Sequence, residues 1–220
     1  MKTITVYLVR HGQTFFNKYN RMQGWSDSPL TEAGIQGAED AAERLRHLTF
    51  THAYSSDTTR AMRTCEIILG KNMNTTVPYH PTPLFREVFY GYFEGADSAQ
   101  TWYQVGAPHG APTFSKIVAQ YGIDASKQFM HDIDPFHDAE TAPQYWTRIG
   151  KGFKMLREEN INGDNVLLVS HGTTIRSIVE KFGQGKFDTT VAPRNASVTK
   201  LQLTAEGITV LYYNRLDKID

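Results

Sequence analysis

The 220-residue chain carries 23 Lys and Arg against 23 Asp and Glu, so it lacks the basic excess of nucleic-acid-binding and membrane-surface proteins. Neither nucleic acid nor membrane is an expected partner, and any basic site must be a local cluster. The single cysteine, Cys65, excludes an intramolecular disulfide and a Cys-rich metal site. The apolar stretch before Arg10 is too short for a signal peptide, and no stretch approaches the ~20 apolar residues of a membrane span. A cytoplasmic location is predicted.

The first predicted element is a buried strand from Ile4 to Val9, because its residues are β-branched or apolar and too few for a helix. It ends in Arg10-His11-Gly12, and a polar loop follows over residues 14–29. The loop is longer than most connections, which indicates a functional role. A helix is expected from Thr31 or Glu32, where small and apolar residues recur at helical spacing: Gly34, Ala38, Ala41, Ala42, Leu45 and Leu48.

A second short strand is predicted over residues 52–54, and it ends at Ser55-Ser56. Asp57 or Thr58 is expected to cap the next helix. A third short strand is predicted around Val77 and Tyr79 and should stop at Pro81 and Pro83. The inner face of the intervening helix should consist of Ala61, Cys65, Ile68 and Leu69.

The periodic pattern loosens between residues 84 and 142. This segment is rich in Gly, Pro, His and aromatic residues, with short helical patches only near 113–121 and 125–130. Long irregular segments inside compact domains usually serve a function. We therefore interpret residues 96–142 as an insertion that covers the site, within a single domain that spans residues 1–220.

Regular structure is predicted again after Pro143, which suits the first turn of a helix. The clearest buried strand, residues 165–170, runs into His171-Gly172 and another helix, and residues 197–203 and 208–213 alternate like a hairpin. Alternating strands and helices predict an α/β fold with a mostly parallel central sheet covered by helices on both faces. The inner faces of the two helices should consist of Trp146, Ile149, Phe153 and Leu156, and of Ile175, Ile178, Val179 and Phe182.

Two predicted strands end in the same way, in His11-Gly12 and in His171-Gly172. The carboxyl ends of parallel strands meet at one edge of a sheet, where open α/β sheets bind ligands. Arg60 and Arg63 follow the end of another strand and are expected near this edge. Arginines bind phosphoryl oxygens and an imidazole can attack phosphorus, so these residues predict a phosphoryl site that needs no metal.

Five motifs in this order and spacing resemble the histidine phosphatase superfamily, in the branch that contains cofactor-dependent phosphoglycerate mutases and related phosphatases. The resemblance covers residues 4–95 and 143–203 and leaves the insertion unmatched. The motifs are Arg10-His11-Gly12, Gly24-x-x-Asp27-x-Pro29-Leu30-Thr31-x-x-Gly34, Ser55-Ser56-Asp57-x-x-Arg60-Ala61, Glu87-x-x-x-Gly91-x-x-Glu94-Gly95 and Ser170-His171-Gly172.

The resemblance implies that His11 attacks the phosphoryl group and forms a phosphohistidine, while Glu87 serves as acid and base. His11 must be neutral for this, and nearby arginine charges would keep it so. Its other ring nitrogen should donate to a backbone carbonyl, and Gly12 should let the phosphate approach closely. The implied set of further site residues is His171, which completes the catalytic residues, and Arg10, Asn17, Arg60, Gln23 and Gly24, which bind substrate. Neither a metal nor an organic cofactor is expected.

Several assignments remain open on the sequence alone. Glu94, Asp57 and Glu180 compete with Glu87 as the acid, although the spacing to Gly91 favours Glu87 and suggests a structural role for Glu94. Arg21 and Gln23 either reach the substrate or shape their loop, and Arg63 reads as a solvated charge. Four residues of the insertion either meet a second anionic group of the substrate or lie on the exposed surface, and they lack the spacing of a zinc centre: His109, Lys116, His131 and His137.

Three functions remain under consideration. The leading hypothesis is a phosphatase for a small phosphorylated metabolite, with inorganic phosphate as product. The alternative is a phosphoglycerate mutase, disfavoured because Val88-Phe89-Tyr90 follows Glu87 where mutases carry basic residues, and because the insertion lacks an arginine pair. A binding module without turnover is disfavoured by the complete residue set. Neither the substrate nor the oligomeric state is predicted, and a homo-oligomer stays possible.

Overall fold

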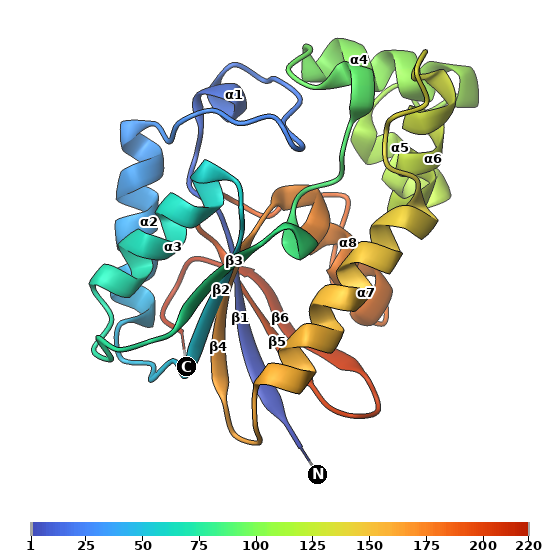
Figure 1. Ribbon diagram of the computed structural model, residues 1–220. Coiled ribbons are helices and arrows are strands. Elements are labelled where there is room, and N and C mark those ends of the chain that lie inside the picture. The colour runs from blue at the N-terminus through green and yellow to red at the C-terminus, as the bar shows by residue number, and fades with distance from the viewer. Residues whose placement is uncertain (1, 220) are drawn as a thin grey trace.

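The computed structural model describes residues 2–219, which are organised around a six-stranded sheet in the order β3-β2-β4-β1-β5-β6 (Figure 1). Strands β3, β2, β4 and β1 run parallel, whereas β5 is antiparallel to β1 and β6 is antiparallel to β5. The predicted α/β class with a mostly parallel sheet is confirmed. The strands are β1 (Ile4–Arg10), β2 (His52–Ser56), β3 (Tyr79–Thr82), β4 (Asn165–Ser170), β5 (Val198–Leu203) and β6 (Ile208–Arg215).

Helices cover both faces of this sheet (Figure 1). Alternate residues of β1 point to opposite faces: Leu8 belongs to one apolar cluster and Val9 to the other, and both are fully buried. The Val9 side packs against α2 (Glu32–Leu45) and α3 (Thr59–Gly70), and the Leu8 side against α7 (Ala142–Glu159) and α8 (Gly172–Phe182). The small-residue face predicted for α2 is therefore a packing face.

The register of the two central strands positions the site. Strand β1 pairs with β4 so that Arg10 lies opposite Ser170. Each strand is followed immediately by a histidine, and the amide of His11 donates to the carbonyl of Ser170 at 3.0 Å. The chain therefore leaves the sheet at the same level in both places, which brings the two histidines together.

Residues 84–142 contain more helix than the sequence predicts. The patches expected near 113–121 and 125–130 correspond to α5 (Phe114–Tyr121) and a longer α6 (Ile123–Ile133), but α4 (Ser98–Gly106) is missed. Helix α4 is short and buries only four residues, so its apolar pattern is weak. Helices α4 to α6 lie beyond the carboxyl ends of the strands (Figure 1). Three short 3-10 helices complete the segment: Pro83–Phe85, Gly91–Phe93 and Ala107–His109.

One smaller expectation is incomplete. The polar loop at 14–29 contains a short helix, α1 (Phe15–Lys18), which begins with a capping box of Thr14 and Asn17. Strand β3 runs through Pro81 and ends at Thr82, directly before Pro83, the second of the two prolines at which it was predicted to stop. Strand β3 is at the edge of the sheet, where proline costs no ladder hydrogen bond. Within residues 2–219, no helix combines the length and the apolar character needed to cross a bilayer.

Candidate active site

The two histidine rings at the ends of β1 and β4 lie side by side, with their centroids 5.1 Å apart. The Nδ1 atom of His11 lies 2.7 Å from the carbonyl oxygen of Gly12. A carbonyl can only accept, so Nδ1 must carry the proton, which leaves Nε2 with a lone pair. The predicted contact to a backbone carbonyl is therefore present, and Nε2 is the nitrogen available for attack on phosphorus.

The environment keeps both rings uncharged. Burial lowers the pKa of His11 well below its ordinary value of 6.5, and the positive charges of Arg60 and Arg10 lower it further. The pKa of His171 is also well below 6.5, first because of burial and then because of the charge of Arg60. A neutral imidazole is what a nucleophile requires near neutral pH.

Arg60 stands at the start of α3 and is fully buried. Its guanidinium donates to the carbonyls of Gly24 (2.7 Å) and Ser26 (2.8 Å), and it forms an ion pair with Asp27 at 3.0 Å. The loop at residues 23–27 thus wraps around this side chain. The Nε atom of Arg60 is buried and has no hydrogen-bond partner among the described residues.

Arg10 and His171 present further polar atoms of this kind. Nη1 of Arg10 donates to the carbonyl of Pro193 at 2.5 Å, whereas its Nε is buried without a partner in residues 2–219. The same holds for both ring nitrogens of His171. A Cβ on Gly172 would lie 3.2 Å from Nε of Arg10, so the glycine leaves room beside the guanidinium. Buried donors cost free energy when unpaired, and these are suited to bind phosphoryl oxygens.

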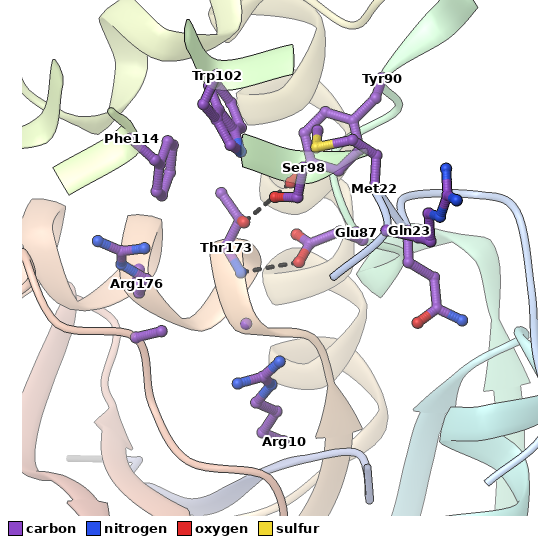
Figure 2. Close-up of a pocket in the computed structure, with 13 residues that line it drawn as sticks. Arg10, Met22, Gln23, Glu87, Tyr90, Ser98, Trp102, Phe114, Thr173 and Arg176 are labelled. Atoms are coloured by element: carbon purple, nitrogen blue, oxygen red, sulfur yellow. Dashed lines mark hydrogen bonds between the residues drawn. The ribbon is translucent and has the colours of Figure 1, made fainter. Parts of the chain in front are cut away.

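Glu87 approaches the same place from the segment after β3. Its Oε2 accepts from the amide of Thr173 at 2.8 Å (Figure 2), and its Oε1 accepts from the amide and hydroxyl of Thr174 at 2.8 and 3.0 Å and from the amide of Val88 at 3.0 Å. The carboxylate thus sits on the amino end of α8, where free amides and the helix dipole favour negative charge.

A cavity of about 150 Å³ lies beside these groups. Arg10, Glu87 and Gly172 line it, whereas His11, Arg60 and His171 are not among its lining residues. At one end lie Arg10 and Glu87, and at the other lie the side chains of Trp102 and Phe114 from α4 and α5, with Arg176 of α8 beside them (Figure 2). Thirteen residues line it: Arg10, Arg21, Met22, Gln23, Glu87, Tyr90, Ser98, Trp102, Phe114, Gly172, Thr173, Arg176 and Ala192.

Sequence reasoning missed several of these lining residues. Trp102 and Phe114 reach the cavity only because α4 and α5 fold over the sheet edge, so no local pattern reveals them. Arg176 offered a signal: it is a charged residue at helical spacing among the buried positions of α8. Its guanidinium donates to the carbonyls of Thr189 and Thr190 and stacks on Phe114 at 4.5 Å.

Not every predicted substrate-binding residue lies in the cavity. Arg10 and Gln23 line it, but Arg60, Gly24 and Asn17 do not. The amide of Gly24 donates to Glu94, and a Cβ there would come within 2.2 Å of Glu94 and of the Val88 carbonyl, so Gly24 is required for packing. The Asn17 Oδ1 accepts from Thr14 and, at 3.3 Å, from the Nδ2 of Asn195. A substrate contact by Asn17 stays a prediction.

Gly12 has a packing role. A Cβ at this position would lie 2.3 Å from the carbonyl oxygen of Gly34 in the first turn of α2. The glycine therefore allows the end of β1 and α2 to approach closely. Room for the phosphate at Gly12 stays a prediction.

The competing acids have structural partners. Glu94 accepts hydrogen bonds from the amides of Gly24, Trp25, Ser26 and Tyr90, which agrees with the structural role suggested for it.

Asp57 does not cap α3 but forms an ion pair with Arg86 at 2.6 Å. Thr58 occupies the N-cap position without a side-chain hydrogen bond. The side chain of Asp27 accepts from the amide of Thr59 and so supplies the capping hydrogen bond that Thr58 does not make. Glu180 accepts from the amide of Ile123.

The histidines of the insertion do not reach the cavity. His131 and His137 each pair Nδ1 with a backbone carbonyl, at 2.7 and 3.0 Å, and His109 stacks on Phe129 at 3.6 Å. Among the residues described, no group of three or more His, Cys, Asp or Glu side chains is placed to hold a metal ion. Arg63 lies on the exposed side of α3, paired with Glu66, as predicted.

Comparison with known proteins defines the class to which this fold and site belong. The family model of the histidine phosphatase superfamily, branch 1, matches residues 6–113 and 103–216. The match includes residues 96–142, so the expectation that the insertion lies outside the family resemblance is wrong. The chain therefore belongs to the histidine phosphatase superfamily.

Individual relatives carry different activities. The chain is 29% identical to 2,3-bisphosphoglycerate-dependent phosphoglycerate mutase 2 of Gloeobacter violaceus over 174 residues, which are 78% of this chain and 72% of the relative. It resembles the crystal structure of a phosphoglycerate mutase from Bacillus anthracis, with a TM-score of 0.90, 31% identity and coverage of 98% and 94%. A phosphoserine phosphatase from Entamoeba histolytica shares the fold, with a TM-score of 0.64, 20% identity and coverage of 98% and 99%.

Proposed function

We propose that the protein is a phosphatase that hydrolyses a small phosphomonoester through a phosphohistidine on His11. One observation carries the proposal: next to the neutral His11 ring, buried donor atoms of Arg10, Arg60 and His171 have no partner in residues 2–219. A phosphoryl group in line with the His11 Nε2 would accept from the Nε atoms of Arg10 and Arg60 and from one ring nitrogen of His171, because a neutral imidazole carries a single N–H. Three further groups of the cavity then account for proton transfer and for the fit of the leaving group: Glu87, Trp102 and Phe114.

In the first step, the lone pair of His11 Nε2 forms a bond to phosphorus while the bond to the ester oxygen breaks. Glu87 must enter this step protonated, although the amides of Thr173 and Thr174 favour its ionised form, and it gives that proton to the departing oxygen as the alcohol leaves. The guanidiniums of Arg10 and Arg60 stabilise the charge that builds on the equatorial oxygens. The carbonyl of Gly12 stabilises the ring by accepting from Nδ1.

In the second step, water replaces the alcohol. Glu87, now ionised, takes a proton from the water, whose oxygen forms a bond to phosphorus as the bond to Nε2 breaks. Inorganic phosphate and neutral His11 are restored. Splitting one difficult displacement into two easier ones is the advantage of a covalent intermediate.

The far wall of the cavity favours hydrolysis over transfer to a second phosphate-bearing molecule. Met22, Trp102 and Phe114 form much of this wall, and apolar side chains do not hold a second phosphate. Arg176 already uses its Nε and Nη2 atoms on two backbone carbonyls. A phosphoryl donor with several negative charges would therefore be held weakly, and water would react first.

A phosphoglycerate mutase is the second candidate, and a specific observation favours it. The expectation that further cations are missing holds for the insertion only, because Arg21 and Arg176 bring two guanidiniums to the cavity from other parts of the chain. The relatives with 29% and 31% identity are named as phosphoglycerate mutases. The experiment must therefore distinguish phosphatase activity from mutase activity.

Phosphate release from a panel of phosphomonoesters tests the proposal, with mutase turnover of 3-phosphoglycerate measured in parallel, with and without a bisphosphoglycerate primer. We expect release that falls about 10⁴-fold or more in His11→Ala. Phosphate release that survives this substitution contradicts the phosphohistidine. Primer-dependent turnover that exceeds hydrolysis makes the protein a mutase. Phosphate binding without any turnover would identify a binding module.

A further inference from the structure

Arg148, on the face of α7 that looks toward the Glu87 segment, has every guanidinium N–H engaged by a hydrogen bond. Its Nη1 donates to the carbonyls of Leu84 and Arg86 at 3.1 and 3.0 Å, and its Nη2 donates to the carbonyl of Glu87 at 3.1 Å. Its Nε and Nη2 also donate to the two carboxylate oxygens of Glu140, at 2.8 and 2.7 Å. A guanidinium has five N–H donors in a rigid plane, and here all five are used.

A second side chain, from a residue that precedes Glu87 in the chain, donates to the same Glu87 carbonyl oxygen. The indole Nε1 of Trp25 donates to the carbonyl of Glu87 at 3.0 Å. The Trp25 ring packs against Phe89 at 4.8 Å between centroids, and the guanidinium of Arg86 lies 4.7 Å from it. The Glu87 carbonyl is therefore held by two side chains that come from the loop after β1 and from α7.

We propose that Arg148 and Trp25 are positioning residues that set the place of Glu87 in the reaction. The proposal rests on the proposed function, in which Glu87 moves the proton. Neither residue lines the cavity, so each acts through the backbone of the segment that carries Glu87. Glu87 is held in two places: its side-chain carboxylate accepts from the amides at the start of α8, and its backbone carbonyl accepts from Arg148 of α7 and from Trp25.

Glu140 completes the arrangement by neutralising the buried guanidinium. Only 13% of the Arg148 side chain and 9% of the Glu140 side chain are exposed, so neither charge is solvated well enough to stand alone. The Glu140 amide also donates to the carbonyl of Phe89 at 2.8 Å. The end of the insertion is thereby tied to the Glu87 segment.

The dependence of rate on the leaving group distinguishes positioning from general stability. A misplaced acid harms substrates with poor leaving groups, such as alkyl phosphates, more than it harms 4-nitrophenyl phosphate, whose leaving group needs no proton. A loss of folded enzyme lowers both rates by the same factor. The ratio of kcat/KM for the two substrates therefore reports the position of Glu87 alone.

The experiment compares this ratio in four variants. Glu87→Gln sets the size of a complete loss of the acid. Arg148→Met is made together with Glu140→Gln, so that no buried charge is left unpaired. Trp25→Phe removes one donor and keeps an aromatic ring at a side chain that is 39% exposed, so we expect this variant to fold. Arg157→Met is the matched control, because Arg157 lies on the same helix and also donates to two backbone carbonyls, of Thr204 and Gly207, at the far turn.

We expect the double variant to lose about 100-fold on the alkyl phosphate and less than about threefold on 4-nitrophenyl phosphate, because a small misplacement of a reacting group costs about that much. Trp25→Phe should change the ratio in the same direction by about fivefold, having lost one of the two donors. Arg157→Met should leave the ratio unchanged.

Equal losses on both substrates in the double variant and in Trp25→Phe, while Glu87→Gln remains selective for the alkyl phosphate, overturn the positioning role and leave the proposed function intact. If Glu87→Gln itself shows no selectivity, Glu87 is not the acid, and the proposal and that part of the mechanism fall together.

Discussion

The two ends of the cavity are built in different ways. At the sheet edge, beside the end of the cavity that Arg10 lines, Arg60 and the two histidines are buried, and each is held by backbone groups or has polar atoms without a partner among the described residues. At the far end, Trp102 and Phe114 come from short helices of the insertion and are held by ring packing, with centroids 4.3 Å apart. Directional contacts fix atoms to fractions of an ångström, whereas apolar packing tolerates exchange. We therefore infer that the sheet edge defines the reaction and that the far wall defines the choice of substrate.

The strongest test of this division is Arg60→Met. It removes the guanidinium at the sheet edge and leaves Asp27 without its partner, so kcat/KM should fall about 10²–10³-fold. The free energy of unfolding should fall by about 3 kcal/mol. Steady-state kinetics and urea unfolding measure the two effects.

Arg63→Met on the same helix is its control, because Arg63 is exposed and should change stability by less than about 0.5 kcal/mol. Equal effects of the two substitutions would contradict the central place of Arg60.

The pH dependence of stability tests the burial of the histidines. Both have a pKa in the folded chain below the ordinary value of about 6.5, so the unfolded chain binds more protons. The stability that this provides is complete above pH 6.5 and is lost as the pH falls toward the folded-state pKa. Between pH 6.5 and that point, unfolding should become easier by up to about 1.4 kcal/mol per pH unit for each histidine.

Urea unfolding of the wild type and of His171→Gln at several pH values measures this slope. The variant has one buried histidine fewer, so its slope should be smaller. An unchanged slope would mean that His171 is charged in the folded protein, against the structure.

A smaller and substrate-dependent effect is expected at the far wall. Trp102→Leu should raise KM about tenfold for 1-naphthyl phosphate and less than about threefold for methyl phosphate, because only the larger leaving group reaches the indole. The value of kcat for methyl phosphate should stay within about twofold.

Tyr103→Leu is the control, since this neighbour on α4 is 61% exposed and lies outside the cavity. A fall in kcat for methyl phosphate in Trp102→Leu would show that the far wall takes part in the reaction. It would contradict the inference that this wall only defines the choice of substrate.

The smallest effect is expected for Arg21→Gln. Arg21 lines the cavity but is exposed, so its charge is screened by salt and acts mainly on the approach of an anion. The value of kcat/KM should fall about threefold at low ionic strength and hardly at all at 0.5 M salt. A loss above 100-fold that persists in high salt would indicate a tightly bound second anion and favour the mutase reading.

The sequence alone determined the α/β class and the sheet edge. Strands that end in His11 and His171 are short-range patterns, and the parallel pairing that joins them follows from alternating strands and helices. Glu87 was predicted by its motif, and its place on the amino end of α8 agrees with the expected convergence on the cavity. Local sequence carries this information because strand ends and helix starts are set by neighbouring residues.

Only the tertiary structure decided the rest. The close approach of Gly12 and Gly24 to the backbone of Gly34 and Val88, which leaves no room for a Cβ at either position, follows only from the fold. Trp102 and Arg148 reach the site or its support from helices far away in the chain, so no spacing in the sequence relates them to Glu87. Residues that are far apart in the sequence come into contact only when the helices that carry them pack together. That packing is a property of the assembled fold.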